Sequence, residues 1–159
     1  MGALRGWQGK VRIVTATQGN ASGFEDAPDP RLTSAPFETS VDSEKVYVIG
    51  TRDAVDILMS TQEVSGSVER PFFSDNASNQ IVHAGNGSAF TLAEVAGIEG
   101  GEPIECWMAI QPHSNTSFVF VLKGVKFRGW SFNVAAGDVT TERADFDATS
   151  INISTMTLE

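Results

Sequence analysis

The sequence predicts a mostly β protein, built as a β-sandwich or partly open barrel with one short helix and a long early loop. Its apolar runs are short, and several alternate with polar residues at the two-residue period of a strand. Gly, Pro, Asn and Asp punctuate the chain densely, as they do between short strands. The sequence contains no internal repeat of solenoid length. Its short apolar runs predict six to eight strands.

The 159 residues fit a single domain, 1–159, that is large enough to bury a core. Hydrophobic residues make up 41% of the sequence and include ten Phe and three Trp, which excludes a disordered chain. Cys106 is the only cysteine, so an internal disulfide and a thiolate metal cluster are excluded. We therefore expect stability to come from packing, hydrogen bonding and association.

The first elements are a strand and a long aperiodic stretch. Alternation predicts the strand over 10–16. Residues 18–43 are rich in Gly, Asn, Asp, Ser and Pro and have no period, so they predict an extended loop or arm. Phe24, Leu32 and Phe37 lie within it. A free linker does not need such side chains, whereas a loop that docks on a neighbour does, which makes the three residues candidates for contacts between subunits.

The next elements are also strands. Residues 45–51 contain four consecutive apolar residues and predict a strand, and 52–59 fit either a helical turn or more strand. Residues 62–73 alternate between an apolar and a polar face, which is typical of a strand with one buried side. The apolar face holds Val64, Gly66, Val68 and Phe72, and the polar face holds Glu63, Ser65, Ser67 and Glu69.

One segment predicts a short helix. Thr91 stands three residues before Glu94, which is the spacing of a capping box. Apolar residues follow at helical spacing, and the glycines of 97–101 supply an end. The apolar residues are Leu92, Val95 and Ile98.

The second half of the chain returns to strands. Residues 103–111 predict one, 112–115 a turn, and 117–127 the most apolar strand of the chain, buried on both faces. Alternation then predicts a strand over 130–134, a turn over 135–138 and a long final strand over 139–153. In the final strand one face holds Ala144, Phe146 and Ala148, and the other holds Arg143, Asp145 and Asp147.

The charge balance limits the possible partners. The formal net charge is −9 and the pI is about 4.6, and the basic residues are scattered. Holding nucleic acid requires clustered Lys and Arg, so the chain is not a nucleic-acid-binding protein of that kind. No apolar run reaches the roughly 20 residues that span a bilayer, and residues 1–18 lack the apolar core of a signal peptide, so we expect no membrane association.

No set of residues predicts catalysis, a metal site or a cofactor. His83 and His113 lack ligands at metal-binding spacing and are expected in loops or at the surface. Cys106 is expected as a small buried residue of a strand. The glycines form no phosphate-binding loop. Acidic residues that could pair as in a glycosidase are expected on solvent faces of strands: Glu102, Glu105, Asp138, Glu142, Asp145 and Asp147.

Three segments follow one another in a distinctive order. They are 46–50 (VYVIG), 61–73 (TQEVSGSVERPFF) and the strand pair of 118–127 (FVFVLKGVKF) and 138–151 (DVTTERADFDATSI). In this order, with a short helix between them, they resemble the tail tube proteins of tailed viruses such as bacteriophages and the inner tube proteins of contractile injection systems. The similarity covers about residues 45–153, while the first 44 residues match less clearly.

The resemblance implies a structural protein and not an enzyme. In that family six subunits form a ring whose inner wall is a continuous β-barrel with four strands from each subunit. The rings stack helically into a tube, and a long loop or hairpin reaches the neighbouring ring. The lumen holds the tape-measure protein and later the DNA. Implied further partners are sheath, baseplate and terminator proteins. The implied location is the tail of the virion, with assembly in the host cytoplasm.

The residues themselves agree with such a tube. A closed barrel removes free strand edges, and the 18–43 loop is a natural stacking arm whose candidates for inter-ring contacts are Phe24, Leu32 and Phe37. An acidic lumen would let DNA slide instead of binding it. The candidates for lumen-facing side chains come from the polar strand faces: Glu63, Ser65, Ser67, Glu69, Asp145 and Asp147.

Two other functions stay open from the sequence. The chain could be a monomeric β-sandwich binding or decoration module of a virion, with 18–43 as its ligand loop. Asn-x-Ser/Thr sequons suit that module, although chance accounts for them in a chain this rich in Asn, Ser and Thr. A hydrolase with paired carboxylates is the third hypothesis. The sequons are Asn20, Asn76, Asn86, Asn115 and Asn152.

Overall fold

A computed structural model of the chain describes residues 9–50, 52–54, 56–112 and 119–154. These residues contain nine strands, which join into one mixed sheet, so the prediction of a mostly β protein is confirmed. The sheet does not close into a barrel within the described part of the chain. The strands are β1 (Lys10–Thr15), β2 (Phe37–Val46), β3 (Asp56–Pro71), β4 (Gln80–Gly85), β5 (Ser88–Thr91), β6 (Cys106–Gln111), β7 (Val119–Asn133), β8 (Thr141–Ala148) and β9 (Ser150–Ser154).

The helical segments are all short. The predicted helix is confirmed as α3, and both hydrogen bonds of its capping box between Thr91 and Glu94 are present. None of the helices in the described ranges has the length and apolar character needed to cross a membrane. The segments are the 3₁₀ helix η2 (Ala16–Gln18), α1 (Ala21–Asp26), α2 (Asn76–Asn79) and α3 (Leu92–Val95).

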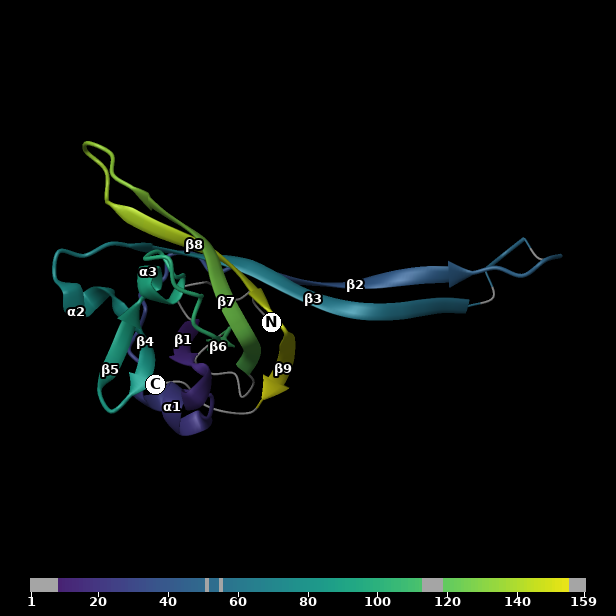
Figure 1. The fold of residues 1–159 in the computed structure, drawn as a ribbon, viewed down its shortest axis with the longest axis horizontal. Coiled ribbons are helices and arrows are strands. Elements are labelled where there is room, and N and C mark those ends of the chain that lie inside the picture. Colours follow the sequence, from purple (N-terminus) through teal and green to yellow (C-terminus); the bar gives the residue numbers. More distant parts are fainter. Residues whose placement is uncertain (1–8, 51, 55, 113–118, 155–159) are drawn as a thin grey trace, which may run out of the picture.

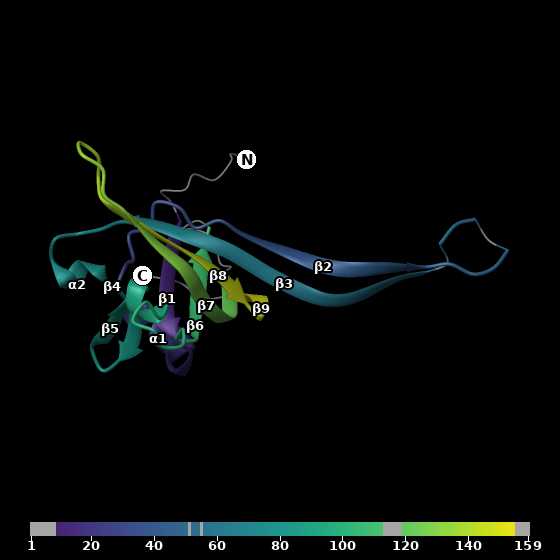
Figure 2. The same ribbon diagram turned by 45° about the horizontal axis from the view of Figure 1, so that its top comes forward.

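The long strand β7 joins two layers. Its first half pairs with β6 and β9, and its second half pairs with β8, so the sheet order is β2-β3-β8-β7-β6-β1-β4-β5. Gly124 and Gly129 have φ of 65° and 60°, which non-glycine residues rarely adopt, and these two positions bend the strand. Figures 1 and 2 show β2, β3 and β8 as the upper layer and β1, β4, β5 and α1 beneath it.

The main core lies between these layers. Val68 of β3 and Phe146 of β8 pack in one fully buried cluster with Ile13 of β1 and Leu122 of β7. A smaller cluster lies under α1 and includes Val121. Since Val121 and Leu122 are adjacent in β7 and are buried in different clusters, residues 119–125 are covered on both faces, as predicted, while Lys126 is exposed.

The largest departure from prediction is the hairpin of β2 and β3. Its outer half stands away from the body as a long projection (Figures 1 and 2). The strand predicted over 45–51 is wrong in its position, because β2 ends at Val46 and residues 47–50 belong to the tip of the hairpin. The ambiguous stretch 52–59 contributes the start of β3 at Asp56. The aperiodic stretch 18–43 is also wrong as one loop, since it contains α1 and the beginning of β2.

Other boundaries differ for local reasons. The sequence interpretation missed β4, β5 and α2. The strand expected over 130–134 is the continuation of β7, and the final strand is divided into β8 and β9 at Thr149, whose N–H and hydroxyl both bond to the Lys123 carbonyl oxygen (2.9 and 3.0 Å). A Cβ at Gly124 would collide with the Thr149 side chain, so this crossing requires glycine.

Gly66 marks the tightest backbone approach at the base of the hairpin. A Cβ there would collide with the carbonyl oxygen of Pro36 and lie 2.7 Å from Cζ of Phe146. We expect Gly66→Ala to lower the free energy of unfolding by about 1–3 kcal/mol in urea titrations, as other overpacked sites do. Gly101→Ala is the control, since no atom lies within 4 Å of its added Cβ. Equal effects of the two substitutions would contradict this explanation.

Candidate assembly surfaces

One face of the β2-β3-β8-β7 sheet is polar. The backbone register aligns Glu38, Ser65, Asp147 and Lys126 across the four strands. The opposite face directs Val64, Val68, Ala144 and Phe146 into the core, so the sheet has one buried and one solvent-exposed side. The polar face collects every side chain that the sequence proposed for a lumen: Glu63, Ser65, Ser67, Glu69, Asp145 and Asp147.

Ion pairs on this face neutralise part of its acidic charge. Arg128 Nε donates to Oδ2 of Asp147 at 2.8 Å, and this hydrogen bond raises the pKa of Arg128. Asp145 lies 3.4 Å from Nη2 of Arg143 and 4.0 Å from Nη1 of Arg128. The expected acidic face is therefore mixed, and its unpaired carboxylates are on β2 and β3. The sequence analysis took its lumen candidates only from the polar faces of 62–73 and 139–153, so it did not include the basic side chains of β7.

Two edges of the same sheet are free. Among the described residues, the only strand that pairs with β2 is β3, and residues 126–133 of β7 pair only with β8 because the pairing with β6 ends at Val125. All three pairings within this four-stranded sheet are antiparallel. Therefore β2 and β7 run in opposite directions, and β7 of one copy can lie against β2 of another while the antiparallel pattern continues.

The tip of the β2–β3 hairpin is apolar and exposed. Tyr47 is 60% exposed, Val48 48% and Ile49 fully exposed, and Ile57 on the opposite strand is half exposed. An exposed apolar group of this kind at the end of a projecting hairpin marks an interaction site.

The side chains expected to contact a neighbouring ring lie elsewhere. Phe24 is 1% exposed and belongs to the core cluster under α1, so its surface is already buried within the chain. Leu32 and Phe37 are partly buried against the main core. The projecting arm of the described structure is the β2–β3 hairpin, to which the 18–43 stretch contributes only 37–43 of β2, so the expectation that the whole stretch forms the arm is corrected.

A buried ion pair holds the base of the hairpin. Arg70 of β3 is 0% exposed and donates from Nη1 to Oε1 of Glu142 on β8 at 2.6 Å. It also donates to the carbonyl oxygens of Pro30 (2.9 Å) and Ser78 (2.8 Å). Trp130 Nε1 donates to the second oxygen of Glu142 at 3.2 Å. The cluster ties the loop at Pro30, helix α2 and three strands together.

Glu142 was expected on a solvent face, which is wrong. Its sequence position gave the signal, because it has the same parity as Ala144 and Phe146 and therefore points into the core. Arg70 likewise has the parity of Val64 and Val68. Two charged residues on apolar faces of adjacent strands indicate a buried pair.

Cys106 and His83 are buried residues of strands. Cys106 is fully buried, as predicted, and burial, with a contribution from Glu105, raises the pKa of its thiol to about 12. His83 is 7% exposed within β4, so its expected place in a loop or at the surface is wrong. His113 lies outside the described residues. No group of three His, Cys, Asp or Glu among the described residues is arranged to hold a metal ion.

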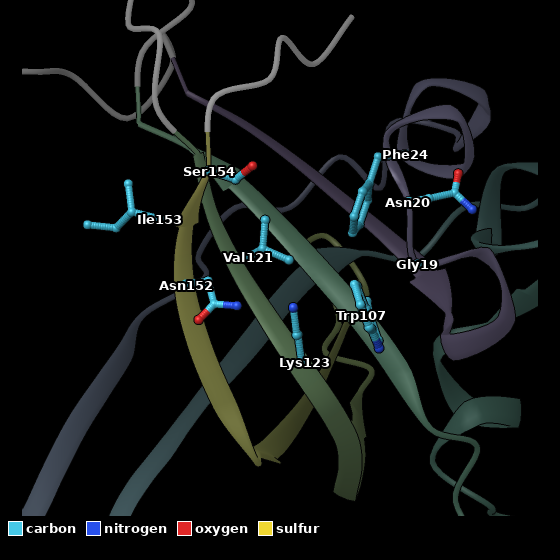
Figure 3. Close-up of a pocket in the computed structure, with 9 residues that line it drawn as sticks. All are labelled: Gly19, Asn20, Phe24, Trp107, Val121, Lys123, Asn152, Ile153 and Ser154. Atoms are coloured by element: carbon cyan, nitrogen blue, oxygen red, sulfur yellow. The ribbon is translucent and has the colours of Figure 1, made fainter.

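A pocket of about 390 Å³ lies on the outer side of β6, β7 and β9. Figure 3 shows Gly19, Asn20 and Phe24 on one side of it and the strands on the other. The Lys123 ammonium lies 4.9 Å from the ring centroid of Trp107, so the cation of this pocket is already held by a cation–π contact. None of the described residues that line the pocket is acidic, so it offers no carboxylate pair.

Solved structures share this fold over nearly the whole chain. The sheath/tube terminator of the extracellular contractile injection system PVC has a TM-score of 0.65 and 9% identity, and the match covers 97% of this chain and 98% of that one. The SPP1 tail tube has a TM-score of 0.64 and 10% identity, with 98% and 81% covered. The chain has the tail tube fold. A tail protein of an empty GTA particle with C6 symmetry matches similarly, with a TM-score of 0.60, 8% identity and 97% and 99% covered.

The likeness to tail tube proteins is one of fold. No protein-family model matches the chain, and no curated protein matches it significantly. Within the tail tube fold of this chain, the polar sheet face, the two free edges and the projecting hairpin are candidate surfaces for assembly.

Proposed function

We propose that the chain is a structural subunit that assembles into stacked hexameric rings, forming a hollow tail tube through which a genome passes. The observation that carries this proposal is the four-stranded antiparallel sheet with a polar face and two free edges of opposite direction. The tail tube fold of solved neighbours supports it.

The free edges favour a closed assembly. An exposed strand edge carries unpaired backbone N–H and C=O groups that template uncontrolled association. When β7 of each copy pairs with β2 of the next, both edges are satisfied and the contact is heterologous, which generates a ring if the rotation closes. Six copies would then enclose a barrel whose inner wall is the polar face.

The hairpin of β2 and β3 supplies the contact between rings in this proposal. Its outer half projects from the body and ends in the apolar side chains of Tyr47, Val48 and Ile49. Burying these side chains on a neighbouring ring would stabilise a stack by the hydrophobic effect.

The proposed lumen is polar and carries both signs of charge, with net acid on β3. Such a wall lets DNA pass without neutralising its phosphates. The proposed partners are further copies of the chain, a tape-measure protein and DNA within the lumen, and sheath, baseplate and terminator proteins. The proposed location is the tail of a virion, with assembly in the host cytoplasm, and the role requires no catalysis.

A second candidate is a monomeric binding or decoration module. One observation favours it, since the 18–43 stretch contributes Gly19, Asn20 and Phe24 to the pocket of Figure 3. The volume of about 390 Å³ is within the range of small-molecule sites. The module requires a chain that stays monomeric despite its free edges.

Negative-stain electron microscopy of the purified protein over a concentration series separates these candidates. The tube function predicts hollow tubes or six-fold rings whose number rises with concentration. Uniform monomers at every concentration would reject it and favour the binding module.

A further inference from the structure

Charge is segregated by strand on the polar sheet face. At one edge, Glu38 on β2 and Glu63 on β3 are exposed acidic residues beside the body of the protein. At the other edge, β7 presents Lys126 and Arg128 and no acid on this face. The central strand β8 carries both signs. We call Glu38 and Glu63 the acidic edge, and Lys126 and Arg128 the basic edge.

The charges at the two edges are not fully used within one chain. Arg128 is paired with Asp147 and Asp145 on β8. Within the described residues Lys126 forms no ion pair, and neither do Glu38 and Glu63. All three side chains are exposed, so pairing them does not require opening the fold.

We propose that these edges recognise one another between copies, with the basic edge of one subunit lying against the acidic edge of the next. This inference rests on the proposed tube function, and the partner is a second copy of the same chain. It follows from charge complementarity together with the opposite directions of β2 and β7.

Charge also selects among the three ways in which the edges of two copies can pair. Two copies could join β2 to β2 or β7 to β7 through a two-fold axis, and both contacts would be antiparallel. The first places acid against acid and the second places base against base, so both are disfavoured. The remaining contact, basic edge to acidic edge, is heterologous and leads to a ring instead of a closed dimer.

Two complementary charge reversals test the proposal. Lys126→Glu places an acid at the one position of the basic edge that has no ion pair among the described residues, so acid faces acid between copies. Glu38→Lys with Glu63→Lys replaces both acids of the acidic edge with bases, so base faces base. We expect each variant to raise the concentration needed for half-assembly, followed by light scattering and negative stain, by about tenfold or more at low salt. Glu99→Lys is the matched control, because Glu99 is exposed in the loop after α3 and belongs to neither edge.

An equimolar mixture of the two variants gives the decisive result. In alternating order each contact again joins one acidic and one basic edge, so the mixture should assemble near the wild-type concentration. Circular dichroism should show unchanged melting for every variant, since the substituted side chains are exposed.

The outcomes separate the two claims. Two results would overturn the proposed recognition between the edges while leaving the tube function in place. In the first, each charge-reversal variant alone assembles as well as the wild-type chain. In the second, the mixture assembles no better than either variant alone. A wild-type chain that remains monomeric under all conditions overturns the tube function, and the edge pairing with it.

Discussion

Replacing residues 42–61 with an Asn-Gly turn should give rings that do not stack into tubes. Val41 and Gln62 are register partners in β2 and β3, so a two-residue turn can join them directly. The replacement removes the apolar tip with Tyr47 and Ile49 while keeping the part of the hairpin that pairs with the body. The measurement is negative stain together with sedimentation velocity.

The fold should survive this change. None of the core residues that the structure describes lies in the removed segment, so the melting temperature should stay close to that of the wild type. A milder variant, Tyr47→Ser with Ile49→Ser, keeps the hairpin length and should weaken stacking in the same direction. Tubes of wild-type length from the shortened chain would contradict the role of the hairpin as the contact between rings.

Glu142→Ala should be among the most destabilising single substitutions in the chain. It leaves the Arg70 guanidinium buried without its carboxylate and removes the acceptor of the Trp130 indole. Breaking a buried pair by removing one partner typically costs about 3–5 kcal/mol, and we expect a loss of that size in the free energy of unfolding. Urea titration followed by fluorescence of the tryptophans measures it.

Two further variants separate the buried charge from lost packing. Arg70→Met with Glu142→Leu removes both charges and should recover much of the stability, because well-packed apolar residues can replace a buried pair. Asp147→Asn breaks an exposed pair with Arg128 and should have a much smaller effect. If Asp147→Asn and Glu142→Ala destabilise the chain equally, burial is not the reason for the cost.

Local pattern predicted the parts of the structure that depend on neighbours in the sequence. The alternation of 62–73 placed Ser65 and Ser67 on the polar face, because side chains of a strand alternate strictly. The capping box at Thr91 located α3, because its hydrogen bonds link residues three apart.

The β4–β5 hairpin was missed although a signal was present. Asn86 and Gly87 both have positive φ, 53° and 75°, and they join the register pair Gly85 and Ser88. An Asn-Gly pair between two short strands is the sequence typical of such a turn. The sequence analysis tested these glycines for a phosphate-binding loop and did not assign strands to the residues on either side.

Features that depend on contacts between residues distant in the sequence could not be predicted from the local sequence pattern. Residues 46–49 are β-branched or aromatic, so propensity predicts a strand, but β2 ends at Val46, and Tyr47 and Ile49 are exposed and bury little of the surface that favours an extended conformation. The contacts of Arg70 with Pro30 and Glu142 cross 40 and 72 residues of sequence, and only the assembled sheet brings them together.

Cysteine labelling of assembled tubes tests the central claim, that the polar face of the β2-β3-β8-β7 sheet lines a lumen. The native Cys106 is buried and its pKa is raised to about 12, so it gives no background. Ser65→Cys marks the polar face and Ser22→Cys marks α1 on the opposite side of the protein (Figures 1 and 2).

In assembled tubes, Ser65→Cys should react with a small maleimide but not with a maleimide attached to a protein too large to enter the tube. Ser22→Cys should react with both reagents, and dissociated subunits of both variants should react with both. Equal reaction of the two variants with the large reagent in intact tubes would contradict a lumen lined by this face.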